Sequence, residues 1–338
     1  MKRKTTAILF SIMGMMILIL DSKTALQGAY GGIELCIKTV IPSLFPFFVL
    51  SILLTSSLSG SEIHFLRPLS NLCGIPSGAE SILITGFLGG YPVGAQCIAQ
   101  SWKSGQLSKK EAHRMLGFCS NAGPAFLFGM TGALFEAPLI TWSLWMIQIL
   151  SAILVAVILP GRSHGRITAE HAAPISIAKA LTRAVSVMAG VCGWVVMFRV
   201  MLSIGEKRIF YMLPTEIMVI LTGFLELTNG CVLLNGIGSD GIRYVLCSMF
   251  LAFGGICVAM QTASVTAELG TGMYFPGKLL QCTIAGSLAC IISPLLFSAQ
   301  HDAIYALCGG LGIISCAIFL NFIIFRKNNS RNTALQRV

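Results

Sequence analysis

Uncharged apolar runs recur along this chain, and several reach the roughly 20 residues that an α-helix needs to cross a lipid bilayer. They extend over most of the 338 residues, so they cannot all belong to one core wrapped in polar surface. Only 11% of the residues are charged, against about 25% in soluble domains, and the mean hydropathy is +0.82. The pattern predicts an all-α polytopic membrane protein in contact with the lipid bilayer and argues against a soluble enzyme.

About eight transmembrane helices are predicted. They are residues 6–20, 41–58, 117–135, 139–159, 185–202, 244–267, 279–297 and 303–325, with an amphipathic stretch at 24–40 before the second. The first span follows a basic start, which a cleaved signal peptide would share. No small-residue cleavage site of convincing form follows, so we expect this helix to be retained.

Two further apolar stretches, residues 81–100 and 216–234, are interrupted near their middle by glycine, proline or polar residues. We interpret each as a re-entrant helical hairpin, which enters the membrane part-way and turns back. With eight spans and two hairpins both termini lie in the cytoplasm. Of the 23 Lys and Arg residues, 17 then lie on the cytoplasmic side, 5 on the outer side and 1 within a span. This bias agrees with the positive-inside rule.

The two halves of the chain resemble each other. Residues 85–88 and 222–225 both read Thr-Gly-Phe-Leu, and each half has an amphipathic stretch, a span, a hairpin, a glycine-broken span and another span. Three full spans per half reverse the direction of the second copy. We therefore predict two inverted-topology repeats, an arrangement typical of secondary transporters. The predicted domains are an N-terminal helix (1–23), repeat 1 (24–160), repeat 2 (161–300), and a C-terminal span with a basic tail (301–338).

The interruptions mark the candidate binding site. Non-helical backbone survives in hydrocarbon only where it lines a cavity or is buried in protein, and helix N-termini suit anionic ligands. Close helix packing is the alternative role for the glycines. Glu226 is a functional candidate because an intramembrane carboxylate is costly; a protonated carboxyl bonded to backbone is its alternative. The candidate substrate-binding residues are Gly90, Tyr91, Gly94, Gln96, Ser120, Asn121, Glu226, Thr228 and Asn229.

Other classes of function lack their sequence signatures. No histidine lies in an HExxH or other metal-ligand spacing, and no GxxxxGK[ST] phosphate loop is present. The scattered basic residues form no nucleic-acid footprint. Most of the 12 cysteines lie in apolar runs, and no CxxC pair exists. We expect no catalytic residues, metal, cofactor or nucleic-acid partner, and we expect a small-molecule substrate.

Several segments resemble the YlbJ-type sporulation integral membrane proteins: residues 41–48, 89–95, 118–126, 223–230 and 253–255. The run from 89 to 126 is the most specific part. The resemblance implies a nucleoside-recognition (Gate) domain in each half and a relationship to concentrative nucleoside transporters. It also implies that the substrate is dipicolinic acid, moved out of the mother-cell cytoplasm across the outer forespore membrane during sporulation.

Two alternatives to that function stay open. One is a nucleoside or other small-metabolite transporter of the same fold, and the other is a non-transporting membrane scaffold of the spore envelope. A scaffold would not require matched interruptions in both halves. The sequence therefore favours a secondary-type transporter of a small polar or anionic metabolite, in the cell membrane or the outer forespore membrane.

Overall fold

A computed structural model describes residues 2–58, 62–163, 165–167 and 175–297. The regular secondary structure of this part is helical apart from one isolated β-bridge, which confirms the all-α fold class. Its first half contains α1 (Lys2–Leu20), α2 (Ser22–Leu35), α3 (Ile41–Leu58), α4 (Arg67–Cys73), α5 (Glu80–Leu88), α6 (Val93–Lys103), α7 (Lys109–Met115), α8 (Pro124–Leu134) and α9 (Pro138–Ile158). Its second half contains α10 (Ile177–Arg208), α11 (Thr215–Leu225), α12 (Leu227–Leu233), α13 (Asp240–Phe253), α14 (Gly255–Val265) and α15 (Tyr274–Leu296). The predicted last span, 303–325, and the basic tail lie outside the described residues.

Within the described residues, five helical segments are long and apolar enough to cross a membrane. They are Ser22–Leu58, Pro138–Ile158, Ile177–Arg208, Asp240–Val265 and Tyr274–Leu296. The chain is therefore an integral multi-pass membrane protein. Each segment contains or closely overlaps one predicted span, whereas the predicted first span corresponds to α1, of which Ser11–Leu20 counts as a shorter apolar helix.

One continuous helix covers 37 residues, Ser22–Leu58, because a π-helical turn, Cys36–Val40, joins α2 to α3. We expected the amphipathic stretch 24–40 to be a separate element, and the structure corrects this. At 1.5 Å per residue the helix is about 55 Å long, against a hydrocarbon core of roughly 30 Å. It must therefore tilt or extend beyond the core.

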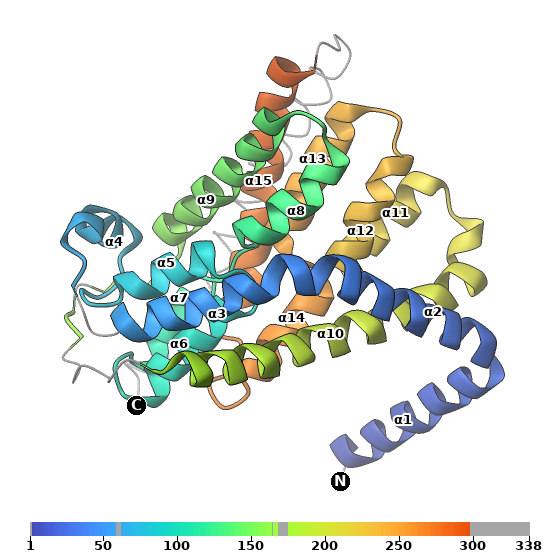
Figure 1. The fold of residues 1–338 in the computed structure, drawn as a ribbon, viewed down its shortest axis with the longest axis horizontal. Helices are drawn as coiled ribbons and strands as arrows, with labels where there is room; N and C mark the ends of the chain where they lie inside the picture. Colours follow the sequence, from blue (N-terminus) through green and yellow to red (C-terminus); the bar gives the residue numbers. More distant parts are fainter. Residues whose placement is uncertain (1, 59–61, 164, 168–174, 298–338) are drawn as a thin grey trace, which may run out of the picture.

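The long helix α10 lies side by side with α2 and α3 (Figure 1). Two glycines of α2 permit the close approach. A Cβ on Gly28 would lie 2.9 Å from the Cα of Val200, and one on Gly32 would lie 2.8 Å from the Cα of Val196. Helices α9, α13 and α15 form a second group that runs steeply relative to this pair (Figure 1).

Short helices with breaks between them occupy the space between these two groups. The chain leaves helical geometry at residues 89–92 between α5 and α6, at Glu226 between α11 and α12, and at Gly254 between α13 and α14. These interruptions lie where the sequence predicted them. The fourth is longer than expected: residues 116–123 are not helical, so the predicted span 117–135 is reduced to the 11-residue helix α8.

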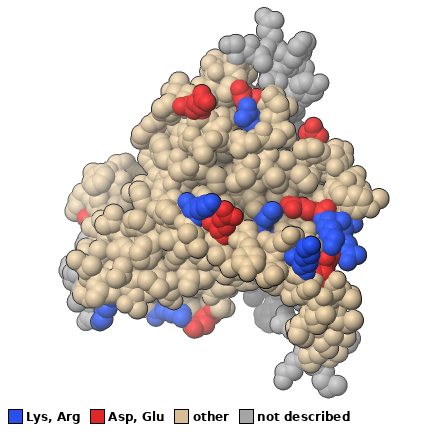
Figure 2. Space-filling view, turned by 45° about the vertical axis from the view of Figure 1, so that its right-hand side comes forward, with Lys and Arg blue, Asp and Glu red and all other residues tan. Residues whose placement is uncertain are grey.

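The outer helices present apolar side chains to their surroundings. Leu20, Ile177 and Leu295 are 75%, 71% and 83% exposed. Figure 2 shows wide areas of one face without Lys, Arg, Asp or Glu. Water would make so much exposed apolar surface costly, whereas lipid contact does not.

Candidate functional site

The interruptions of the helices pack against one another in pairs. In the first half, a Cβ on Gly123 would lie only 2.8 Å from the Cα of Gly90, whose own φ of +76° favours glycine. In the second half, a Cβ on Gly255 would lie 3.2 Å from the carbonyl oxygen of Leu225 and 3.2 Å from the amide nitrogen of Leu227, the residues flanking Glu226. In each half, the broken helix thus packs against the turn between two short helices, α5–α6 in the first half and α11–α12 in the second.

Tyr91 connects the two halves. Its ring lies beside Gly254, where a Cβ would be 3.1 Å from the ring's Cζ atom. Its hydroxyl donates to the carbonyl oxygens of Leu251 and Ala252, both at 3.4 Å. All four interruptions therefore meet in one buried region.

A narrow cavity, here termed the central cavity, lies in this region. Its lining residues are Val40, Leu44, Tyr91, Ala122, Gly123, Phe126, Val191, Val195, Glu226, Leu227, Thr228, Val258 and Gln261. Its volume of about 40 Å³ is room for a few water molecules, but not for an organic metabolite. The described conformation is therefore closed around it.

Glu226 is the acidic residue of the central cavity, and it is 2% exposed. Its carboxylate accepts the backbone N–H of Thr228 at 3.1 Å and that of Asn229 at 2.7 Å. The side-chain amide of Asn229 donates a third hydrogen bond at 2.7 Å. The carboxylate thus caps the first turn of α12, a favourable position for a negative charge.

Three other helices begin beside the central cavity without such a cap. The residues preceding α6, α8 and α14 are Pro92, Gly123 and Gly254, and none of them makes a side-chain capping hydrogen bond. Pro124 has no N–H and Val93 donates to Gly90, but the other backbone N–H groups of these first turns carry partial positive charge. These three N-termini are suited to the oxygen atoms of an anionic ligand.

A buried polar network adjoins the central cavity through Tyr91. Lys278 of α15 is 0% exposed, and its Nζ lies 5.0 Å from the centre of the Tyr91 ring. The Nζ donates to Asn121 Oδ1 at 3.2 Å and to Gln281 Oε1 at 2.7 Å. Gln281 also donates to Asn121 and to the carbonyl oxygen of Gln148.

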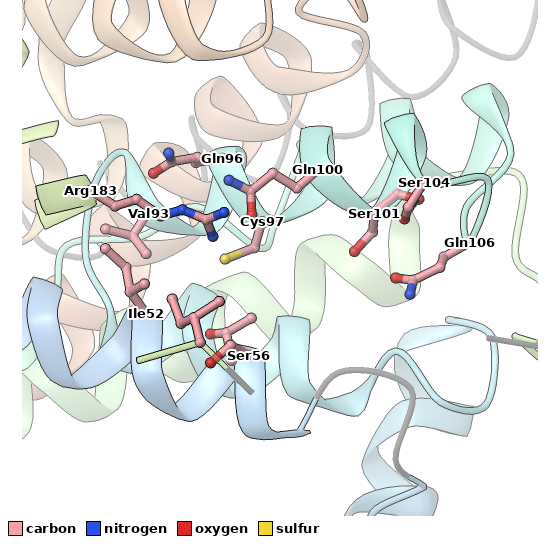
Figure 3. A pocket seen from close by; sticks show the side chains of 12 residues that line it. Ile52, Ser56, Val93, Gln96, Cys97, Gln100, Ser101, Ser104, Gln106 and Arg183 are labelled. Carbon is pink, nitrogen blue, oxygen red and sulfur yellow. Dashed lines mark hydrogen bonds between the residues drawn. The ribbon is translucent and has the colours of Figure 1, made fainter. Parts of the chain in front are cut away.

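A larger pocket of about 250 Å³, here termed the side pocket, lies between α3, α6 and α10 (Figure 3). Its lining residues are Ile52, Thr55, Ser56, Val93, Gln96, Cys97, Gln100, Ser101, Ser104, Gln106, Ile175 and Arg183. Figure 3 shows the Arg183 side chain extending into the pocket towards Cys97 and Gln100. Amide, hydroxyl and guanidinium groups thus share this space.

The predicted site residues divide among these places. Tyr91, Glu226 and Thr228 line the central cavity, whereas Gln96 lines the side pocket. Asn229 lines a third, more open pocket beside α2 and α10.

The other four predicted residues line none of these spaces. Gly90 forms the turn before Tyr91, and Asn121 belongs to the polar network. Gly94 packs against the carbonyl group of Cys119. Ser120 is buried, with no hydrogen-bond partner for its hydroxyl among the described residues.

Lys278, Gln281 and Gln148 are the members of the polar network that we did not predict as site residues. The span predicted at 279–297 begins after Lys278 and so leaves it outside the membrane, whereas α15 begins at Tyr274 and buries the lysine. The signal in the sequence is a Lys and a Gln three residues apart, with apolar residues around them.

Among curated proteins, the chain is similar to the sporulation integral membrane protein YlbJ of Bacillus subtilis (strain 168). The two are 25% identical, and the match covers 83% of this chain and 80% of the relative. That protein is thus a distant homologue. No protein-family model matches the chain, and no solved structure matches it.

Proposed function

We propose that this chain is a secondary-type membrane transporter for a small anionic metabolite, with its substrate site at the central cavity. The observation that carries the proposal is the meeting of all four helix interruptions around one cavity that contains a buried carboxylate. Non-helical backbone in a membrane protein is costly unless it is buried in protein or lines a cavity, and these four breaks meet at a cavity. Transporters with discontinuous helices bind substrate and coupling ions at such breaks.

The repeat organisation is part of the same proposal. Residues 24–160 and 161–300 form two inverted repeats, in which α5–α6 and α11–α12 are re-entrant hairpins. The packing of each hairpin turn against the broken helix of its own half supports this pairing. Both termini lie in the cytoplasm, as the distribution of Lys and Arg favours.

For the substrate we propose dipicolinic acid, moved across the outer forespore membrane or the cell membrane. The distant homologue is named as a sporulation integral membrane protein, and the segments at 89–95 and 118–126 resemble that family. The three uncapped helix N-termini suit a dicarboxylate. The side pocket offers an approach route for it, because the positive charge of Arg183 attracts an anion.

Transport proceeds in this proposal by alternating access. The hairpin-bearing bundle moves against a scaffold made of α3 and α10, which both line the side pocket. Because the central cavity holds only about 40 Å³, the described conformation corresponds to a closed state. Opening towards the side pocket would admit the substrate past Val93 and Gln96.

Uptake of labelled dipicolinate into proteoliposomes tests the function. We expect Glu226→Gln to lower the uptake rate about tenfold or more, because a Gln amide cannot accept all three N–H donors and leaves one buried donor unsatisfied. Glu216→Gln, an exposed change at the start of α11, is the matched control and should transport normally. Normal uptake by the Glu226 variant would remove this carboxylate from the transport site.

The same assay separates the alternatives. A nucleoside transporter would show competition of uptake by nucleosides and none by unlabelled dicarboxylates. A non-transporting scaffold would show no uptake of any candidate solute and no ligand-dependent shift of the melting temperature. Either result would contradict transport of dipicolinate.

A further inference from the structure

Lys278 of α15 is a fully buried lysine. In the part of the chain described here it forms no ion pair, whereas the other close Lys and Arg contacts to carboxylates lie at least partly exposed. Its two side-chain hydrogen bonds go to the neutral amide oxygens of Asn121 and Gln281. Amide dipoles thus solvate the amine, and when it is protonated no carboxylate among the described residues offsets its charge.

The surrounding network orients acceptors towards this lysine. Asn121 donates its amide N–H groups to the carbonyl oxygens of Phe118 at 2.8 Å and Gly86 at 3.3 Å, so its oxygen faces Lys278. Gln281 donates to Asn121 at 2.8 Å and to Gln148 at 3.3 Å, so its oxygen also faces Lys278. Two amides whose donors are engaged elsewhere are thus preorganised for a cation.

The third close partner of the Lys278 Nζ atom is an aromatic ring. The Tyr91 ring centre lies 5.0 Å from Nζ, within the range of a cation–π interaction. An ammonium has three N–H donors, and two amide oxygens and a ring occupy them. A ligand can therefore reach Lys278 most readily by replacing Tyr91, the weakest of the three partners.

Tyr91 is also the residue shared between this network and the central cavity, which it lines. Its hydroxyl is held by two hydrogen bonds of 3.4 Å, longer than the usual 2.7–2.8 Å for a hydroxyl donor. Gly254, which has no side chain, lies beside the ring. The hydroxyl makes only long hydrogen bonds, so packing, including that against Gly254, is what keeps the ring beside both Lys278 and the cavity.

We propose that Lys278 is the residue that selects anionic substrates, and that movement of the Tyr91 ring brings its ammonium group into contact with a substrate carboxylate. This inference rests on the proposed transport function and adds the group that determines its charge specificity. An unpaired buried cation in a membrane helix is costly, and pairing with a ligand carboxylate supplies the missing counter-charge. A neutral solute of the same shape would gain no binding energy from such charge pairing with Lys278.

The test compares two ligands of one shape, pyridine-2,6-dicarboxylate and the uncharged pyridine-2,6-dicarboxamide, on the full chain in lipid nanodiscs. We expect wild type to bind the dicarboxylate more tightly. Lys278→Met should weaken dicarboxylate binding about 30-fold or more and leave diamide binding nearly unchanged, because only the charge interaction is lost. Lys278→Arg, which keeps the charge, should retain a preference for the dicarboxylate.

The outcomes separate this inference from the function on which it rests. If wild type binds the dicarboxylate and Lys278→Met binds it equally well, Lys278 has no role in specificity, while the transport function stands. If wild type neither binds nor transports the dicarboxylate, the transport function is contradicted and the specificity role with it.

A second measurement covers the case in which Lys278→Met does not fold. Only the free-amine form of lysine reacts with N-hydroxysuccinimidyl acetate, so acetylation at alkaline pH is followed by mass spectrometry in wild type and in Tyr91→Ala, with exposed Lys38 as the reactive control. We expect Lys278 to be acetylated in Tyr91→Ala and protected by the dicarboxylate but not by the diamide. An unreactive Lys278, or equal protection by both ligands, would overturn the proposal.

Discussion

At the residue scale, Glu226 combines backbone contacts with a position at a cavity. Its carboxylate bonds to the backbone of the turn that it caps, which is the structural role. It also lines the central cavity, which is the position that a substrate-binding group requires. The structural role does not exclude the functional one, because a ligand that accepts the N–H groups of Thr228 and Asn229 would displace the Glu226 carboxylate from them.

Asp21 is another acidic residue of low exposure. It lies directly before the helix Ser22–Leu58 and forms two ion pairs. Lys207 and Arg208, at the end of α10, contact its two carboxylate oxygens at 2.5 Å and 3.0 Å. The hydrogen bonds from Lys207 and Thr24, with that from Arg208, lower the pKa of Asp21 to about 2. The ion pairs thus join the start of α2 to the end of α10.

We expect Asp21→Asn to lower the melting temperature of the detergent-solubilised protein at pH 7, and the difference from wild type to shrink below pH 4. Folding lowers the pKa of this carboxyl from an ordinary value of about 3.9, so its stabilisation is complete above that value. The stabilisation is then lost as the pH falls towards about 2. Melting curves between pH 7 and pH 3 test this, and a difference that stays constant over the range would contradict it.

At the scale of elements, glycine pairs determine how closely the short helices approach. Gly86 of α5 and Gly94 of α6 pack against each other and against the carbonyl of Cys119. Gly223 of α11 and Gly230 of α12 also pack against each other, and Gly223 packs against the Phe250 ring. Gly86 and Gly223 occupy the same place in the two Thr-Gly-Phe-Leu segments, so the repeated sequence corresponds to a repeated packing contact.

We expect Gly230→Ala to destabilise the protein by about 3 kcal/mol, because its Cβ would overlap the backbone of Gly223 and force α11 and α12 apart. Gly190→Ala in α10 is the control, since a Cβ there meets nothing within 4 Å and an alanine favours the helix by about 0.5–1 kcal/mol. Thermal unfolding of the two purified variants distinguishes them. Equal stability of Gly230→Ala and wild type would show that α11 and α12 can move apart without cost, and would contradict this prediction.

At the scale of the whole molecule, the orientation of the segments in the membrane determines how the two halves relate. A re-entrant α5–α6 hairpin returns the chain to the side from which it started, whereas a full span would not. The ten cysteines within the described residues are buried or half-buried, so added surface cysteines can be compared with the parent chain.

We expect Phe65→Cys and Ser104→Cys, on either side of the α5–α6 pair, to react with a membrane-impermeant maleimide only after cells are permeabilised. Tyr211→Cys should react in intact cells, because we place it on the outer side. Phe65 and Tyr211 are 79% and 69% exposed. Labelling of Phe65→Cys and Ser104→Cys from opposite sides would make α5–α6 a full span and contradict the inverted repeats.

Much of the architecture follows from local sequence. A helix in hydrocarbon satisfies its own backbone and requires only a long enough apolar run. Each of the five long helical segments therefore contains or closely overlaps a predicted span, although Ser22–Leu58 and Ile177–Arg208 extend well beyond the spans predicted at 41–58 and 185–202. Breaks are also local, because glycine and proline act on the backbone where they stand. The positions near Gly90, Gly123, Glu226 and Gly254 could therefore be identified from the sequence.

Only the tertiary structure decided which of these breaks meet and which polar residues share a site. Lys278 and Asn121 are 157 positions apart, and no periodicity in the sequence relates them. Gln96, although close to Tyr91 in sequence, lies in a different pocket. Apolar runs and breaks are properties of neighbouring residues, whereas a site depends on long-range packing of helices, and this packing is what buries Lys278 beside Tyr91.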